Sequence, residues 1–181
     1  MLPLTAIVEK MPKAELHMHL EGALEADLLF ALARRNNVAI RYETEDELRA
    51  AYNFTNLRSF LDVYYAGLTV LLKEQDFYDM TWAYLERTRA DNVVHTEVFI
   101  SPQAHTRRNI PFAVMFEGID RALRDAEKRL DMTARLIIGI QRQFPEEAAF
   151  AMVEQAMPYR DRIAGIGMGG PEIGKIGRAH V

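Results

Sequence analysis

The sequence has 181 residues, with 22 Lys and Arg against 26 Asp and Glu, and it contains no cysteine. This length allows one ordinary domain, or one large domain cut short. The net charge of −4 argues against a nucleic-acid partner, which would require clustered basic residues. Without cysteine there can be no disulfide, iron–sulfur cluster, thiolate zinc site or cysteine nucleophile. Any metal must therefore be held by histidine and carboxylate.

The amino-terminal sequence carries no signal for a membrane or for export. No apolar run approaches the ~18–20 residues that a spanning helix needs. The start of the chain lacks a basic segment, Pro3 interrupts its short apolar stretch, and Glu9 and Lys10 follow. We therefore expect a cytoplasmic protein with no membrane partner.

Short strand-like segments alternate with longer helical segments along the chain. The first strand is expected at 14–19, and apolar spacing of three and four residues predicts a helix over 24–36. Thr44 and Glu47 form a capping-box pattern that opens a short helix to about residue 52. The remaining elements are expected as helices over 56–72 and 75–90, a strand over 93–101, a helix over 111–130, a strand over 133–140, a helix over 145–157 and a strand over 163–168.

The alternation of strands and helices predicts an α/β fold with a parallel sheet. Four strand–helix steps fill this chain, whereas a closed TIM (β/α)8 barrel typically takes ~250 residues. The expected fold is therefore about the first four βα units of a TIM barrel. A smaller doubly wound α/β domain is the alternative.

The sequence His17-Met18-His19 is the strongest local feature. Side chains alternate along a strand, so both imidazoles should project to one side at the carboxyl end of the first strand. Two such imidazoles can take neighbouring positions around one Zn²⁺ ion, and barrel enzymes place their chemistry at this end of the strands. A strand histidine that is merely hydrogen-bonded is the simpler alternative.

The residues around this motif closely resemble the opening of the adenosine/adenine deaminase family of metal-dependent amidohydrolases. The resemblance covers about residues 10–174, and it is closest to the adenine deaminase branch. It is carried by the segments Pro12–Ala23, Phe60–Gly67, Glu74–Leu85 and Glu97–Pro102.

The resemblance implies roles for particular residues. His17 and His19 match two zinc ligands, and His19 also belongs to the expected substrate site. Glu21 matches an acidic position that contacts the ribose in adenosine-specific members, where it is Asp. Gly170 matches a backbone contact to the purine. The helix residues that match an apolar lid over the pocket are Leu57, Phe60, Leu61 and Tyr64; helical spacing alone would make these four an ordinary core face.

The same resemblance implies a reaction in which zinc activates a water that attacks purine C6, and ammonia leaves. The family's third zinc histidine, catalytic glutamate, later histidine and zinc aspartate belong to strands beyond Gly170, so we expect no catalytic residue here. His180 is rejected as the third ligand because no room remains for a helix between Gly170 and this residue. A fragment with no activity, which self-associates through open barrel edges, is a further alternative.

The last residues depart from the family pattern. Residues 176–181 can be written in codons that spell the start of a common short-read sequencing adapter. We therefore expect a deaminase segment over 1–174 and a non-native tail over 175–181.

Four other sequence features are weaker indications of function, and for each of them a structural role is the preferred interpretation. Gly165–Gly170 fits G-x-G-x-x-G, but Pro171 follows at once, so dinucleotide binding is rejected. His95 and His105 are expected in core or surface roles. Glu15 is expected to share the strand face of His17 and His19, with a cation such as Lys13 or an arginine as its partner.

Adenine is the expected substrate, because Glu21 replaces the ribose-contacting Asp and residues 60–85 are most similar to the adenine branch. Adenosine is the alternative substrate. A different His-x-His barrel hydrolase, a phosphoesterase, is the other enzyme alternative, but residues 24–90 contain no histidine for it.

Overall fold

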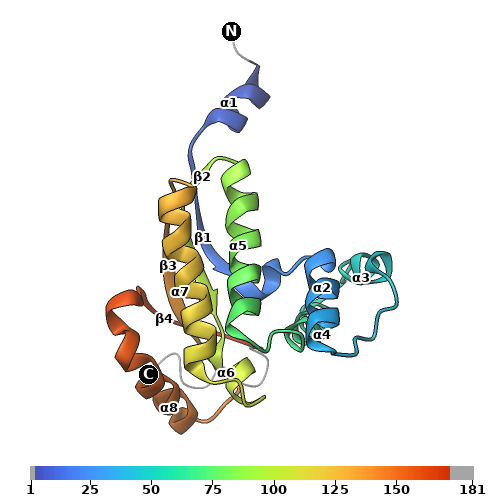
Figure 1. Ribbon diagram of the computed structural model, residues 1–181, viewed down its shortest axis with the longest axis vertical. Coiled ribbons are helices and arrows are strands. Elements are labelled where there is room, and N and C mark those ends of the chain that lie inside the picture. The colour runs from blue at the N-terminus through green and yellow to red at the C-terminus, as the bar shows by residue number, and fades with distance from the viewer. Residues whose placement is uncertain (1–2, 172–181) are drawn as a thin grey trace.

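The computed structural model describes residues 3–171, apart from the side chains of residues 58, 59 and 62. Its centre is a parallel sheet whose four strands lie side by side in chain order (Figure 1). The strands are β1 (Lys13–His19), β2 (Val93–Ile100), β3 (Thr133–Gln141) and β4 (Gly165–Gly169). The sheet and its helices match the first βα units of a TIM barrel, so the fold prediction is confirmed.

In the described part of the chain, one helix precedes the first strand, and the other helices lie in the segments between the strands. They are α1 (Leu4–Lys10), α2 (Ala26–Asn36), α3 (Glu45–Ala51), α4 (Leu57–Leu68), α5 (Glu74–Ala90), α6 (Pro102–Thr106), α7 (Phe112–Arg129) and α8 (Glu146–Ala156), with 3-10 turns η1 (Leu20–Ala23) and η2 (Met157–Arg162). The sequence patterns missed two short helices, α1 and α6. At the start of α3, Thr44 Oγ1 accepts from the Glu47 backbone N–H, but Glu47 itself accepts from Glu43 rather than Thr44.

Helices α5 and α7 lie side by side along one face of the sheet (Figure 1). The core between them and the strands contains fully buried side chains such as Phe77, Phe116, Val98 and Ile138. A Cβ atom at Gly118 would collide with the Glu74 carbonyl oxygen, so only glycine allows α7 to lie this close to α5. None of the helices in the described residues is both long and apolar enough to cross a membrane.

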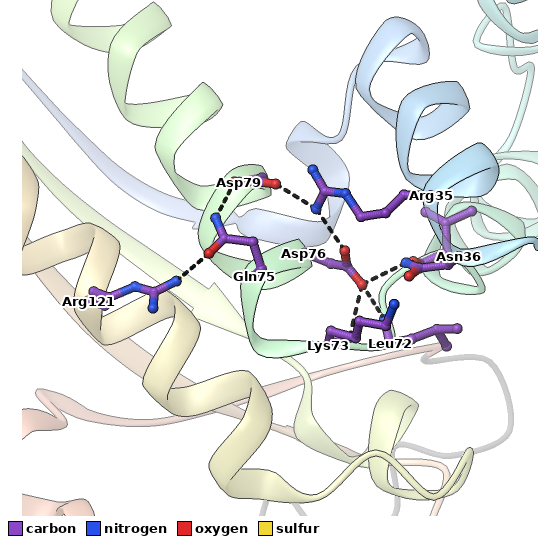
Figure 2. A network of polar contacts seen from close by, with 9 residues as sticks. Arg35, Asn36, Leu72, Lys73, Gln75, Asp76, Asp79 and Arg121 are labelled. Carbon is purple, nitrogen blue, oxygen red and sulfur yellow. Dashed lines mark hydrogen bonds and ion pairs between the residues drawn. The ribbon is translucent and has the colours of Figure 1, made fainter.

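A buried carboxylate joins α2 to the start of α5 (Figure 2). Asp76 is fully buried, and its Oδ1 accepts from Arg35 Nη1 at 3.0 Å. Its Oδ2 accepts from Asn36 Nδ2 and from the backbone N–H groups of Leu72 and Lys73 at 2.7, 3.1 and 2.9 Å. Asp76 therefore satisfies backbone donors at the α5 amino terminus while it holds α2 in place.

Candidate metal and purine site

The carboxyl end of β1 departs from regular strand geometry at His17. This residue has φ +68°, and the pairing of β1 with β2 shifts between Leu16 and Met18. Leu16 pairs with Glu97 and Met18 with Val98, so His17 is the extra residue of a bulge. A left-handed backbone at a histidine costs about 1 kcal/mol, a kind of strain that recurs at functional sites.

The bulge leaves both histidine rings against the same aromatic ring. The ring centroids of His17 and His19 are 5.5 Å apart, and they lie 4.5 and 5.2 Å from that of Phe99. A Cβ atom at Gly167 would lie 2.5 Å from the Phe99 ring, so this glycine makes room for the ring. A Cβ atom at Gly169 would lie 3.7 Å from the His19 ring. The structure thus brings the two predicted ligands together, and the glycines of β4 allow the strand to pass beside them.

The surroundings of His19 favour a neutral imidazole. Burial, the largest effect, and the neighbouring His17 lower the pKa of His19, and they outweigh the nearby Glu21, which raises it. The neutral ring is the form that can bind a metal through nitrogen. In the described part of the chain, no group of three or more potential metal-binding side chains gathers, so these two histidines are the extent of the candidate ligand set here.

Glu21 lies just beyond the histidines in η1 and is 3% exposed. Its Oε1 accepts from the Ser101 backbone N–H at 2.8 Å and lies 3.5 Å from His105 Nε2. Its Oε2 is buried and has no hydrogen-bond partner within residues 3–171. Burial by itself would raise the pKa of the Glu21 carboxyl, but His105 and the backbone N–H groups outweigh it and lower that pKa.

The sequence patterns did not identify the contact between His105 and Glu21. It is fully buried in α6, and its Nδ1 lies 3.4 Å from Arg108 Nη1. The sequence left a core or a surface role open for His105, and the structure places it in the core. Its contact with Glu21 was missed because α6 was not predicted. Pro102 was the available signal for this helix, because it follows the predicted strand and proline is favoured in the first turn of a helix.

The predicted lid residues lie on α4, and they differ in their distance from this carboxylate. Tyr64 is close enough that burial and Glu21 raise its pKa well above the ordinary range, against a lowering effect of Ser101. Phe60 lies 5.8 Å from the Tyr64 ring and is partly buried, as is Leu61. Leu57 is 57% exposed at the start of the helix. The structure therefore places Tyr64 at Glu21, Phe60 next to Tyr64, and Leu57 facing solvent.

Gly170 follows β4 in a conformation that favours glycine. Its φ is +99°, and a Cβ atom there would collide with Gln143 Oε1. The preceding Gly169 is the residue that approaches His19, and its carbonyl oxygen accepts from the Arg142 N–H at 3.0 Å. Gly170 therefore directly follows the residue that lies beside His19, and its own nearest neighbours are Gln143 and the Arg142 backbone.

The prediction for Glu15 is wrong. Glu15 pairs with Thr96, whose buried side chain faces the helices, because the bulge at His17 resets the alternation of β1. The Glu15 carboxylate accepts from the Tyr84 hydroxyl at 2.6 Å. Lys13 instead donates to the backbone carbonyls of Met11 and Asp91. Glu15 therefore lies away from the histidine pair, and its partner is a hydroxyl rather than a cation.

A parallel βα sheet with paired imidazoles at the carboxyl end of its first strand is the arrangement of a barrel enzyme, the class of protein that places its chemistry at this end of the strands. The sequence profile described as "Adenosine deaminase" matches residues 12–180. The chain belongs to this family, as its motifs predicted.

Named relatives are found among both sequences and structures. The chain is 54% identical over 171 residues to the adenine deaminase of Geotalea uraniireducens. The matched region covers 94% of this chain and 48% of that protein. The structure matches an adenine deaminase from Arthrobacter aurescens with a TM-score of 0.87 and 44% identity, over 91% of this chain and 50% of that one. An amidohydrolase from Burkhoderia ambifaria with bound Zn matches with a TM-score of 0.83 and 32% identity, over 97% of this chain and 49% of that one. The chain spans about half the length of the relatives that it matches.

Proposed function

We propose that this chain carries the amino-terminal half of a zinc-dependent site that hydrolyses adenine to hypoxanthine and ammonia. The observation that carries the proposal is the pair of His17 and His19 on one face of Phe99, beside the buried carboxylate of Glu21. Relatives at 44% and 54% identity that are named adenine deaminases support adenine as the substrate.

His17 and His19 are the residues that would hold the metal. Their two nitrogens suit zinc, which takes imidazole ligands, and the lowered pKa of His19 favours the ligating form. The Burkhoderia relative with bound Zn supports this choice of metal. When bound, zinc supplies a nucleophile at neutral pH by lowering the pKa of a water molecule. The remaining ligands and the catalytic acid–base group would come from segments outside the described residues.

The other site residues would bind and enclose the purine. Glu21 offers a buried acceptor oxygen, and Gly170 offers its backbone groups beside the side chain of Gln143. Tyr64 and Phe60, and at the rim Leu57 and Leu61, would cover the base and exclude water as part of α4. Exclusion of water strengthens each polar contact within the site.

Three other predictions stay predictions. They are a cytoplasmic location, association of copies through the edges of the sheet, and a boundary near 174 before a tail of different origin. The boundary and the tail lie outside the described residues.

The function is tested by measuring ammonia release from adenine and from adenosine with the full-length natural gene product that carries this sequence. We expect faster turnover of adenine, loss of activity with a zinc chelator, and recovery on addition of Zn²⁺. Faster turnover of adenosine would contradict the choice of substrate. Activity that survives complete removal of the metal would contradict the zinc site. The 181-residue chain alone is the control, and we expect it to be inactive.

A further inference from the structure

A series of polar groups runs from α4 through the part-buried Arg108 and the buried His105 to Glu21. Arg108 donates to the carbonyl oxygens of Leu68, Leu71 and Thr69 at 2.6, 3.1 and 3.3 Å, where α4 ends. The same guanidinium lies 3.4 Å from His105 Nδ1. The helix that carries the predicted lid residues is therefore joined at its carboxyl end to His105.

The chemistry of arginine fixes the proton on His105. A guanidinium can only donate, so His105 Nδ1 acts as the acceptor and the ring proton lies on Nε2. Nε2 faces Glu21 Oε1 at 3.5 Å. The Nε2–H group of His105 is therefore the group that faces the carboxylate. Its 3.5 Å separation from Oε1 is a close polar contact rather than a hydrogen bond, and Nε2 has no hydrogen-bond partner in the described part of the chain. The edge of the Phe77 ring, 5.0 Å away at 76°, holds the imidazole from another side.

The two oxygens of Glu21 are used unequally. Oε1 faces both the Ser101 N–H and His105, whereas Oε2 is buried without a hydrogen-bond partner in the described part of the chain. Buried polar atoms are nearly always paired, so an unpaired carboxylate oxygen beside a candidate site is available to a ligand's N–H or O–H donor.

We propose that His105 is a positioning residue: together with the Ser101 N–H it holds Glu21 Oε1, so that Oε2 is directed to the purine. This inference rests on the proposed function for its kinetic consequence, but its structural part does not. His105 acts only through Glu21 and touches neither the metal nor the substrate.

The test uses His105→Phe in the full-length gene product, because Phe keeps an aromatic ring against Phe77 and removes the donor. We expect the KM for adenine to rise about tenfold while kcat changes less than about threefold, since a binding contact is lost and the metal site is intact. His105→Gln, which restores an N–H donor, should recover much of this loss. His95→Phe, at a part-exposed histidine near the start of β2, is the control and should leave KM unchanged.

A double-mutant cycle separates positioning from a general packing defect. In a Glu21→Gln background, His105→Phe should cause little further increase in KM, because Glu21 is already impaired. An equal, additive increase in both backgrounds would overturn the proposal, as would failure of His105→Gln to recover activity.

Crystal structures of the wild type and His105→Phe provide a readout that does not depend on activity. We expect the 2.8 Å contact between Glu21 Oε1 and the Ser101 N–H to break in the variant. An unmoved Glu21 would overturn the positioning role. A wild-type protein that does not deaminate adenine would instead contradict the proposed function, and the crystal structures would still decide the role of His105.

Discussion

Asp76 and Glu21 are both buried carboxylates, but the structure satisfies them very differently. Asp76 accepts on both oxygens, from two side chains and two backbone N–H groups (Figure 2). Glu21 accepts one hydrogen bond, from Ser101, and keeps Oε2 unpaired within the described residues. A carboxylate with every oxygen occupied holds elements together, whereas a buried carboxylate oxygen without a partner still has room to accept a hydrogen bond. Equal burial therefore does not imply an equal role.

Replacement of Asp76 should have the largest effect on stability. Asp76→Asn removes the charge that Arg35 faces and one of the acceptors for buried N–H groups, so we expect a loss of about 3 kcal/mol in the free energy of unfolding. The measurement is the urea midpoint of the full-length gene product at constant m-value. Asp79→Asn is the control, because Asp79 also pairs with Arg35 but is 22% exposed, and it should cost at most about 1 kcal/mol. Equal losses would contradict the special role of Asp76.

Loss of the contact between Tyr84 and Glu15 should reduce the free energy of unfolding by less than Asp76→Asn does and by more than Asp79→Asn does. Tyr84 is 1% exposed, and its hydroxyl bonds Glu15 and Thr96 at 2.6 Å each. Tyr84→Phe leaves the buried Thr96 hydroxyl unpaired, so we expect a loss of about 1–2 kcal/mol in thermal or urea unfolding. Tyr78→Phe, which loses only a part-buried bond to Asp125, should cost less than about 1 kcal/mol. A larger loss from Tyr78→Phe would reverse this ranking.

Because the His17 backbone is strained, replacement of His17 should change the free energy of unfolding in the direction opposite to replacement of Asp76. His17→Gly relieves the left-handed backbone, and we expect it to raise the free energy of unfolding by up to about 1 kcal/mol. His19→Gly, at φ −81°, should instead lower it by about 1 kcal/mol. Both variants should lose bound zinc, measured by metal analysis of the full-length protein. A loss of stability with His17→Gly would show that its contacts outweigh the strain.

The smallest expected effect on stability belongs to Glu21. In Glu21→Gln the side-chain oxygen can still accept from Ser101, and a buried charge is removed, so the unfolding free energy should change by less than about 1 kcal/mol. The KM for adenine should nevertheless rise at least about tenfold. If Glu21→Gln destabilised the protein as much as Asp76→Asn, the two carboxylates would share a structural role.

Much of the local structure could be predicted from the sequence. Strand and helix positions followed from periods of two and of 3.6 residues, and β2 and α5 were predicted to within a residue at each end. The short helices α1 and α6 were missed because seven and five residues are too few for a periodic signal. The histidine pair was identified from its spacing and from the family motif around it.

The sequence by itself determined the alternation of strands and helices, the pair of imidazoles and the family, because these depend on spacing along the chain. Only the tertiary structure decided which face Glu15 occupies, since the bulge at His17 depends on pairing with β2. It alone brought His105 to Glu21, because that contact depends on where β2 ends beside β1. A buried carboxylate can have both oxygens paired, as Asp76 has, or one oxygen without a partner among residues 3–171, as Glu21 has. The difference depends on donors from distant segments, and no local pattern contains them.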